Sequence, residues 1–120
     1  MKEESSPSQD STRDLADAWI TEDTRELARA VAALRNEDEA LRFLRDLCTI
    51  RELQEFGRRW QVARLLVSGT PYHEIGERSG ASSATISRVN QWLRFGRGGY
   101  GMLIERVAGE AGKGPGKPSA

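Results

Sequence analysis

A stretch of short polar and cationic side chains between residues 82 and 101 is the part of this sequence best suited to chemistry. It carries three arginines and no Asp or Glu. Arginines bind phosphate oxygens and short hydroxyl side chains can approach base edges, whereas carboxylates are repelled by phosphates. We therefore expect this segment to form a face that binds double-stranded DNA, and His73, just upstream, is one further candidate contact. The predicted contact residues are His73, Ser82, Ser83, Thr85, Ser87, Arg88, Arg94 and Arg97.

Two short helices joined by a glycine corner, over residues 71–95, would present these side chains. Thr70 is expected to cap the first helix, with Pro71 at its first helical position. Gly80 supplies the positive φ of the corner, and Ser82 caps the second helix. This order is that of a helix-turn-helix, whose second helix enters the major groove. An ordinary helix pair of an α-bundle is the alternative, and the missing carboxylates argue against it.

The apolar residues of this segment predict how the two helices pack. Ile75, Ala81, Ile86 and Val89 are spaced to form the internal face of the pair. Gly76 lies four residues before the corner, where we expect a small residue because the second helix crosses at close range.

The rest of the chain also favours helices, because no stretch alternates polar and apolar residues as a strand does. Apolar residues at helical spacing predict helices over about residues 21–34, 37–47, 50–67 and 102–108. The start signals are Thr21 or Asp23, Asn36, and a capping box formed by Thr49 and Glu52, while Gly69 ends the third helix. The predicted fold class is all-α, with five to six helices including the helix-turn-helix.

The length and composition of the chain indicate how many domains it forms and in which compartment it works. Its 120 residues suit one domain, predicted over residues 13–108, between disordered polar tails at residues 1–12 and 109–120. No apolar run reaches the ~18 residues of a membrane-spanning helix, and the polar, acidic N-terminus does not resemble a secretory signal. We therefore expect a cytoplasmic protein. The single cysteine, Cys48, is expected to be a buried hydrophobe.

The net charge of zero hides an uneven distribution. Residues 1–57 carry 14 acidic and 8 basic side chains, a net charge of −6, whereas residues 58–106 carry 8 basic and 3 acidic ones, a net charge of +5. Because phosphates are attracted by a local basic face, the neutral total does not exclude nucleic acid as a partner.

Other kinds of chemistry have little support in the sequence. His73 is the only histidine, so no metal site is expected, and a solvated side chain is as good an interpretation of it as a DNA contact. No nucleophile–base motif occurs, so neither an enzyme nor a cofactor is expected. The glycine-rich residues 96–101 lack the spacing of a phosphate-binding loop. We expect a turn there, with Arg97 and Tyr100 contacting the DNA backbone or a partner subunit.

Residues 42–107 resemble the tryptophan-repressor superfamily, and more closely its YerC/YecD branch. The matching text is LCTIRELQEFGRRWQVARLLVSG at 47–69 and YHEIGERSGASSATISRVNQWLRFGRGGY at 72–100, and its specific part is ATISRVN followed by GxGGY. The resemblance implies an all-α, intertwined homodimer in which residues 71–95 of each subunit read DNA. The sequence itself shows a surplus of apolar residues for one chain to bury, including Trp19, Trp60 and Trp92.

The resemblance also bears on a small-molecule effector. In tryptophan-responsive members two arginines sandwich the indole, and Arg59 and Arg88 stand at the matching positions, with Thr49 and Thr85 also matching. This chain has Val89 in place of a glycine and Trp92 in place of a small serine, and both would fill the space for an indole. We therefore expect no tryptophan binding, and an intramolecular salt bridge is the alternative role for Arg59.

Two further functions compete with a homodimeric DNA-binding regulator. A helix-turn-helix can also dock proteins, and the acidic first half suits a basic partner within the transcription machinery. A small-ligand sensor would need a sealed, arginine-lined cavity beside Arg59 and Arg88. Whether any small-molecule effector binds stays open.

Overall fold

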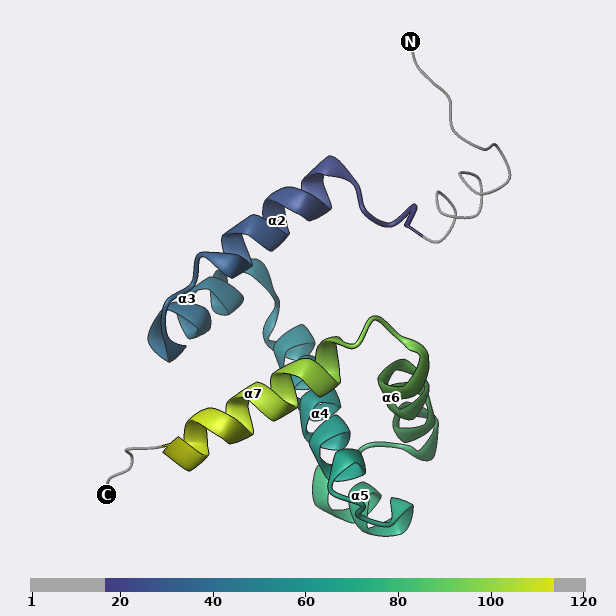
Figure 1. The fold of residues 1–120 in the computed structure, drawn as a ribbon. Helices are drawn as coiled ribbons and strands as arrows, with labels where there is room; N and C mark the ends of the chain where they lie inside the picture. Colours follow the sequence, from purple (N-terminus) through teal and green to yellow (C-terminus); the bar gives the residue numbers. More distant parts are fainter. Residues whose placement is uncertain (1–16, 114–120) are drawn as a thin grey trace, which may run out of the picture. The chain divides into compact units, whose positions relative to one another are not determined.

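The computed structural model describes residues 17–113, and within this range the chain forms six α-helices and no strand (Figure 1). The predicted all-α class is confirmed. The tail predicted at 1–12 lies outside the described residues. The helices are α2 (Glu22–Ala32), α3 (Glu37–Leu47), α4 (Ile50–Val67), α5 (Tyr72–Ser79), α6 (Ser83–Phe95) and α7 (Gly99–Lys113).

The chain divides between Leu47 and Cys48 into two compact units. The first unit contains α2 and α3, and neither helix has a buried residue. Their starts are nevertheless well capped. The Thr21 hydroxyl accepts a hydrogen bond from the Thr24 amide (3.1 Å), and the Asn36 side chain accepts one from the Glu39 amide (2.9 Å). These contacts confirm Thr21 and Asn36 as helix starts.

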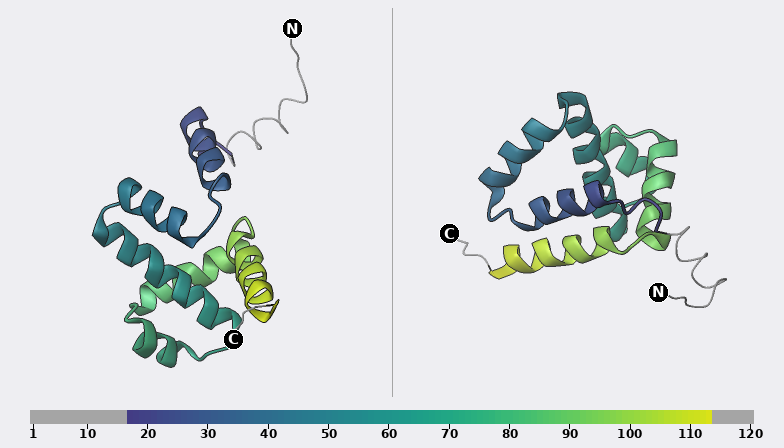
Figure 2. Two further views of the ribbon diagram at one scale, coloured as in Figure 1. Left: turned by 90° about the vertical axis from the view of Figure 1, so that its left-hand side faces the viewer. Right: turned by 90° about the horizontal axis from the view of Figure 1, so that it is seen from above.

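The second unit is built around α4, which contacts α5, α6 and α7; the three views in Figures 1 and 2 show these helices gathered around it. Burying an aliphatic side chain contributes ~1.5–3 kcal/mol, so the core of this unit determines how the helices pack. The four residues predicted for the internal face of the helix pair are all in it. The core residues are Val62, Ala63, Leu65, Ile75, Ala81, Ile86 and Val89.

Helix α4 begins and ends as the sequence predicted. The Thr49 hydroxyl accepts a hydrogen bond from the Glu52 amide (3.1 Å), and the Glu52 carboxylate accepts one from the Thr49 amide (2.8 Å). At the other end, Gly69 adopts a φ of 82°, and the amides of Gly69 and Thr70 donate to the carbonyls of Leu66 and Leu65. This glycine-based cap satisfies carbonyls that the helix leaves unpaired.

Two predicted helix boundaries are wrong. Thr70 does not cap α5, because its hydroxyl bonds Ser68 at the end of α4, and extended Pro71 takes the N-cap position without a side-chain bond. The last helix begins at Gly99 rather than Met102, because the Gly98 carbonyl accepts a hydrogen bond from the Met102 amide (3.0 Å). It continues to Lys113, so residues 109–113 of the predicted C-terminal tail are helical, and the rest of that tail lies outside the described residues.

No helix in the described range is both long enough and apolar enough to cross a membrane.

Candidate nucleic-acid interface

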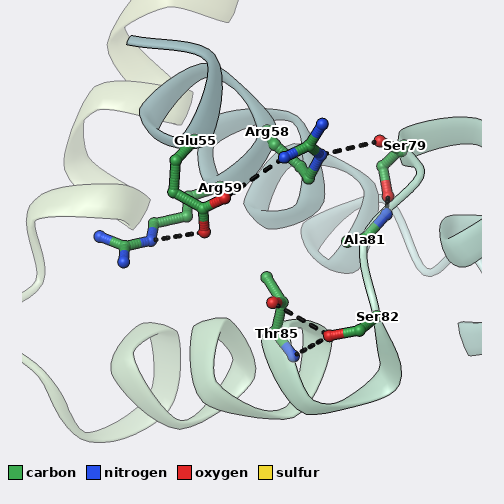
Figure 3. A network of polar contacts seen from close by, with 7 residues as sticks. All are labelled: Glu55, Arg58, Arg59, Ser79, Ala81, Ser82 and Thr85. Atoms are coloured by element: carbon green, nitrogen blue, oxygen red, sulfur yellow. Dashed lines mark hydrogen bonds and ion pairs between the residues drawn. The ribbon is translucent and has the colours of Figure 1, made fainter. Parts of the chain in front are cut away.

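The corner between α5 and α6 is held by hydrogen bonds of its own residues. Gly80 adopts a φ of 75°, as predicted, and its amide donates to the Gly76 carbonyl (2.9 Å). The Ser79 hydroxyl donates to the Ile75 carbonyl (2.6 Å) and accepts from the Ala81 amide (3.1 Å), a contact drawn in Figure 3. Because its polar groups are paired, the corner can set a fixed angle between the two helices.

The crossing of the two helices is less tight at Gly76 than the sequence suggested. A Cβ atom added there would lie 3.6 Å from the Ala81 carbonyl oxygen and 3.9 Å from the terminal methyl of Ile86. These are ordinary contact distances, so alanine fits at this position and only a larger side chain would push the helices apart.

Ser82 caps α6, as expected. Its hydroxyl accepts a hydrogen bond from the Thr85 amide (3.1 Å) and donates to the Thr85 hydroxyl (3.2 Å), as Figure 3 shows. The first turn of α6 contains no acidic residue. The positive end of the helix dipole is therefore not neutralised by a carboxylate of its own first turn, which favours the approach of an anion.

One stripe of α6 faces away from the core, and we call its four exposed residues the outer stripe: Ser83, Ser87, Gln91 and Arg94. The spacings of four, four and three residues place them along one side of the helix. Ile86 and Val89 on the opposite side are buried. Gln91 is not among the contact residues predicted from the sequence, although its distance of four residues from Ser87 places it on the same side of the helix.

Most other predicted contact residues are also exposed: His73, Ser82, Arg88 and Arg97. Thr85 differs, because it is half-buried and its hydroxyl takes part in the cap of α6. Arg88 and Arg94 form no ion pair with any residue that the structure describes, whereas Glu74 of α5 pairs with Arg78 of the same helix (3.5 Å).

Three of the four residues expected at an effector site, Thr49, Arg59 and Thr85, have partners within the chain. Thr49 belongs to the capping box of α4. The Arg59 side chain forms the alternative salt bridge, with Nε 3.4 Å from the Glu55 carboxylate. Its guanidinium carbon also lies 5.2 Å from the centre of the Trp92 ring on α6 and 5.8 Å from that of the Phe56 ring. A cation this close to the face of an indole is attracted by the ring.

Glu55 was not identified from the sequence, yet it joins two arginines of α4 (Figure 3). One carboxylate oxygen lies 3.3 Å from Arg58 and the other lies 3.4 Å from Arg59. Arg58 also donates from Nε to the carbonyl of Ser79, the last residue of α5 (3.4 Å). The same carboxylate is therefore linked to α5 by one arginine and to α6 by the other.

Tyr100, expected to contact DNA or a partner subunit, packs against Trp60 of α4 in its own chain. The two ring centres are 6.3 Å apart and the ring planes differ by 28°. Partial burial raises the pKa of the Tyr100 hydroxyl, and the positive charge of Arg59 opposes that shift. Among the described residues no three His, Cys, Asp or Glu side chains gather to hold a metal ion.

Comparisons with known proteins agree with this geometry. The family described as Trp repressor protein matches residues 22–108. YerC of Bacillus subtilis (strain 168) is 44% identical over 82 residues, which cover 68% of this chain and 79% of that protein. The crystal structure of a TrpR-like protein from Eubacterium eligens ATCC 27750 matches with a TM-score of 0.72 and 39% identity, covering 77% of this chain and 95% of that one. A crystal structure from Staphylococcus aureus, described as a candidate Trp repressor, matches with a TM-score of 0.73 and 38% identity, covering 78% and 94%.

Proposed function

The chain belongs to the Trp repressor family, and we propose that it is a sequence-specific, DNA-binding transcriptional regulator that acts as a homodimer through α5 and α6. The observation that carries this proposal is the outer stripe of α6, which is exposed and free of acidic side chains while the opposite side of the helix is buried. In this function the protein is a non-enzymatic regulator working in the cytoplasm, where the DNA is.

In the proposed complex, α6 lies in the major groove. Its N-terminus, with Ser82 and Ser83, meets phosphates and base edges. Ser87 and Gln91 lie deeper, where the carboxamide can bond both N6 and N7 of an adenine. Arg88, Arg94 and Arg97 supply most of the salt-dependent affinity, His73 on α5 meets the phosphate backbone, and Thr85 keeps the first turn of α6 in place.

The homodimer is supported by the apolar side chains that one chain leaves exposed. Large exposed apolar patches mark interaction sites in soluble proteins. We propose that a second copy covers those on α2, α3, α4 and α7, namely Leu27, Val31, Leu41, Leu47, Ile50, Phe56, Met102, Leu103 and Val107. A two-fold dimer would then place two α6 helices roughly 34 Å apart, one turn of DNA, so its target should be a palindrome.

We also propose that the regulator does not respond to tryptophan. Trp92 lies over Arg59, and Val89 is fully buried in the core. An incoming indole would have to displace the indole that the chain already holds against this arginine.

The second candidate function is docking on a protein of the transcription machinery. It is favoured by the acidic first turns of α2 (Glu22, Asp23) and α3 (Glu37, Asp38, Glu39), which suit a basic partner. On this alternative, charge reversals on α2 and α3 would abolish the regulatory effect, whereas substitutions on α6 would not.

The experiment that tests the proposal is selection of bound duplexes from random DNA, with and without tryptophan. We expect enrichment of one palindromic sequence under both conditions. Failure to enrich any sequence would contradict the DNA-binding function, and enrichment only in the presence of tryptophan would contradict its independence from that ligand.

A further inference from the structure

We infer that Glu55 is a positioning residue for DNA reading, because its carboxylate holds the two arginines that connect α4 to α5 and to α6. This inference rests on the proposed DNA-binding function. Glu55 is on α4 and does not contact DNA in the proposed complex. Its role is to fix α5 and α6, the two helices that do contact DNA.

The first connection leads to the end of α5. Arg58 is paired with one oxygen of Glu55 (3.3 Å) and donates to the Ser79 carbonyl (3.4 Å). The side-chain Nε2 of Gln61, also on α4, donates a hydrogen bond to the Arg78 carbonyl (3.5 Å). The last carbonyls of a helix lack partners within the helix and form the negative end of its dipole, so a cation held there is favourable. The result is that α4 fixes the end of α5 immediately before the Gly80 corner.

The second connection leads to α6. Arg59 is paired with the other oxygen of Glu55 (3.4 Å), and its guanidinium lies over the Trp92 ring. Trp92 is followed, two residues later, by Arg94 of the outer stripe. Movement of Arg59 would therefore remove one of the contacts that position the half of α6 carrying Gln91 and Arg94.

The two arginines are consecutive residues of α4, and Figure 3 shows their guanidinium groups on opposite sides of Glu55. All three side chains are between 36% and 40% exposed. Ion pairs with this exposure contribute little to the stability of a fold. DNA recognition depends on such contacts more than folding does, because a recognition site works only when its side chains are held within about 0.5 Å of the productive position. We therefore expect loss of Glu55 to impair reading of DNA sequence more than folding.

The test is the substitution Glu55→Gln, which keeps the size of the side chain and removes the charge. Charge alone predicts tighter DNA binding, because a repulsive carboxylate is lost. Positioning predicts the opposite result. The control is Glu26→Gln, which also removes one carboxylate, from an ion pair with Arg29 on α2 (3.0 Å).

The full-length protein is titrated at one salt concentration with the duplex enriched by selection and with a random duplex of the same length. We expect Glu55→Gln to weaken binding of the enriched duplex about fivefold to tenfold relative to Glu26→Gln, the effect of losing one good base contact. Affinity for the random duplex and the thermal midpoint should be equal in the two variants. The ratio of the two affinities separates positioning from a general loss of structure.

Equal or tighter binding of the enriched duplex by Glu55→Gln would overturn the inference and leave the proposed function standing. A wild-type chain that enriches no sequence would overturn the proposed function, and the inference with it. Should Glu55→Gln not fold, Arg59→Lys decides the question, since it keeps the charge and removes the planar group over Trp92. We expect weaker binding of the enriched duplex by this variant, and unchanged binding would overturn the inference.

Discussion

The guanidinium carbon of Arg59 lies 5.2 Å from the centre of the Trp92 ring, so an arginine of α4 rests on an indole that belongs to α6 of the same chain. In the proposed function this contact helps to position α6, and the Trp92 ring occupies the face of Arg59 that a free indole would need.

Tryptophan at millimolar concentration should change neither the thermal midpoint of the protein nor its affinity for DNA. A ligand that binds only the native state raises the midpoint as its concentration rises, so thermal denaturation detects binding directly. In the variant Trp92→Ala, which vacates the face of Arg59, indole should raise the midpoint. A rise in the wild-type midpoint on adding tryptophan would contradict the proposal that the Trp92 ring occupies the face of Arg59.

Replacing Arg94 and Arg97 together by alanine should weaken DNA binding and flatten its salt dependence. Each phosphate contact contributes about 0.9 to the slope of log affinity against log salt. A homodimer loses two arginines in each of its two subunits, so the slope for one bound duplex should fall by about 3.6. Titrations of one duplex at several salt concentrations measure it. The matched control is Arg25→Ala with Arg42→Ala, which removes the same charge from α2 and α3. An equal change in both double variants would mean that only net charge matters.

Substitution by alanine should have different effects at Gly76, which lies within α5, and at Gly80, which follows its last residue. Gly80 has a φ of 75°, where a Cβ is strained by roughly 1–2 kcal/mol, so Gly80→Ala should lower the free energy of unfolding by about that amount. Gly76 has room for a methyl group, and alanine favours a helix by ~0.8–1 kcal/mol over glycine, so Gly76→Ala should be neutral or stabilising. Urea denaturation compares the two. Equal losses would disprove the packing described at this corner.

The stability of the second unit should fall in alkaline solution because of Tyr100. Burial raises the pKa of its hydroxyl in the folded state above the unfolded value, so the stabilisation is present below about pH 10 and is lost as the pH rises through the folded pKa. Urea midpoints measured across this range should fall more steeply for the wild type than for Tyr100→Phe. Parallel curves would show that Tyr100 titrates as it does in the unfolded chain.

Local features of this fold could be predicted from sequence because their hydrogen bonds span only a few residues. The Thr49–Glu52 box, the Ser82 cap and the left-handed Gly80 each depend on neighbours within one turn of chain. The buried side of the helix pair was predictable for a related reason, since the spacing of Ile86 and Val89 within one helix decides which side is apolar.

Features that depend on how helices meet could not be predicted. The position of Arg59 over Trp92, and the double role of Glu55, require α4 and α6 to be placed side by side. The sequence predicts Thr70 as the cap of α5, because it does not show that the Thr70 hydroxyl bonds Ser68 instead. It predicts Tyr100 in a turn that contacts DNA or a partner subunit, whereas α7 begins at Gly99 and the Tyr100 ring packs against Trp60.

The proposed function requires that α6 present DNA with a surface that carries no negative charge, and the substitution Ser83→Glu tests this requirement. A carboxylate in the first turn of a helix interacts well with the helix dipole, so the fold should be as stable as before or slightly more stable. The measurement is the affinity for the enriched duplex, compared with Ala28→Glu, which adds the same charge to an exposed position on α2. We predict that Ser83→Glu abolishes specific binding while Ala28→Glu retains it. Equal affinity in the two variants would contradict the placement of α6 against DNA.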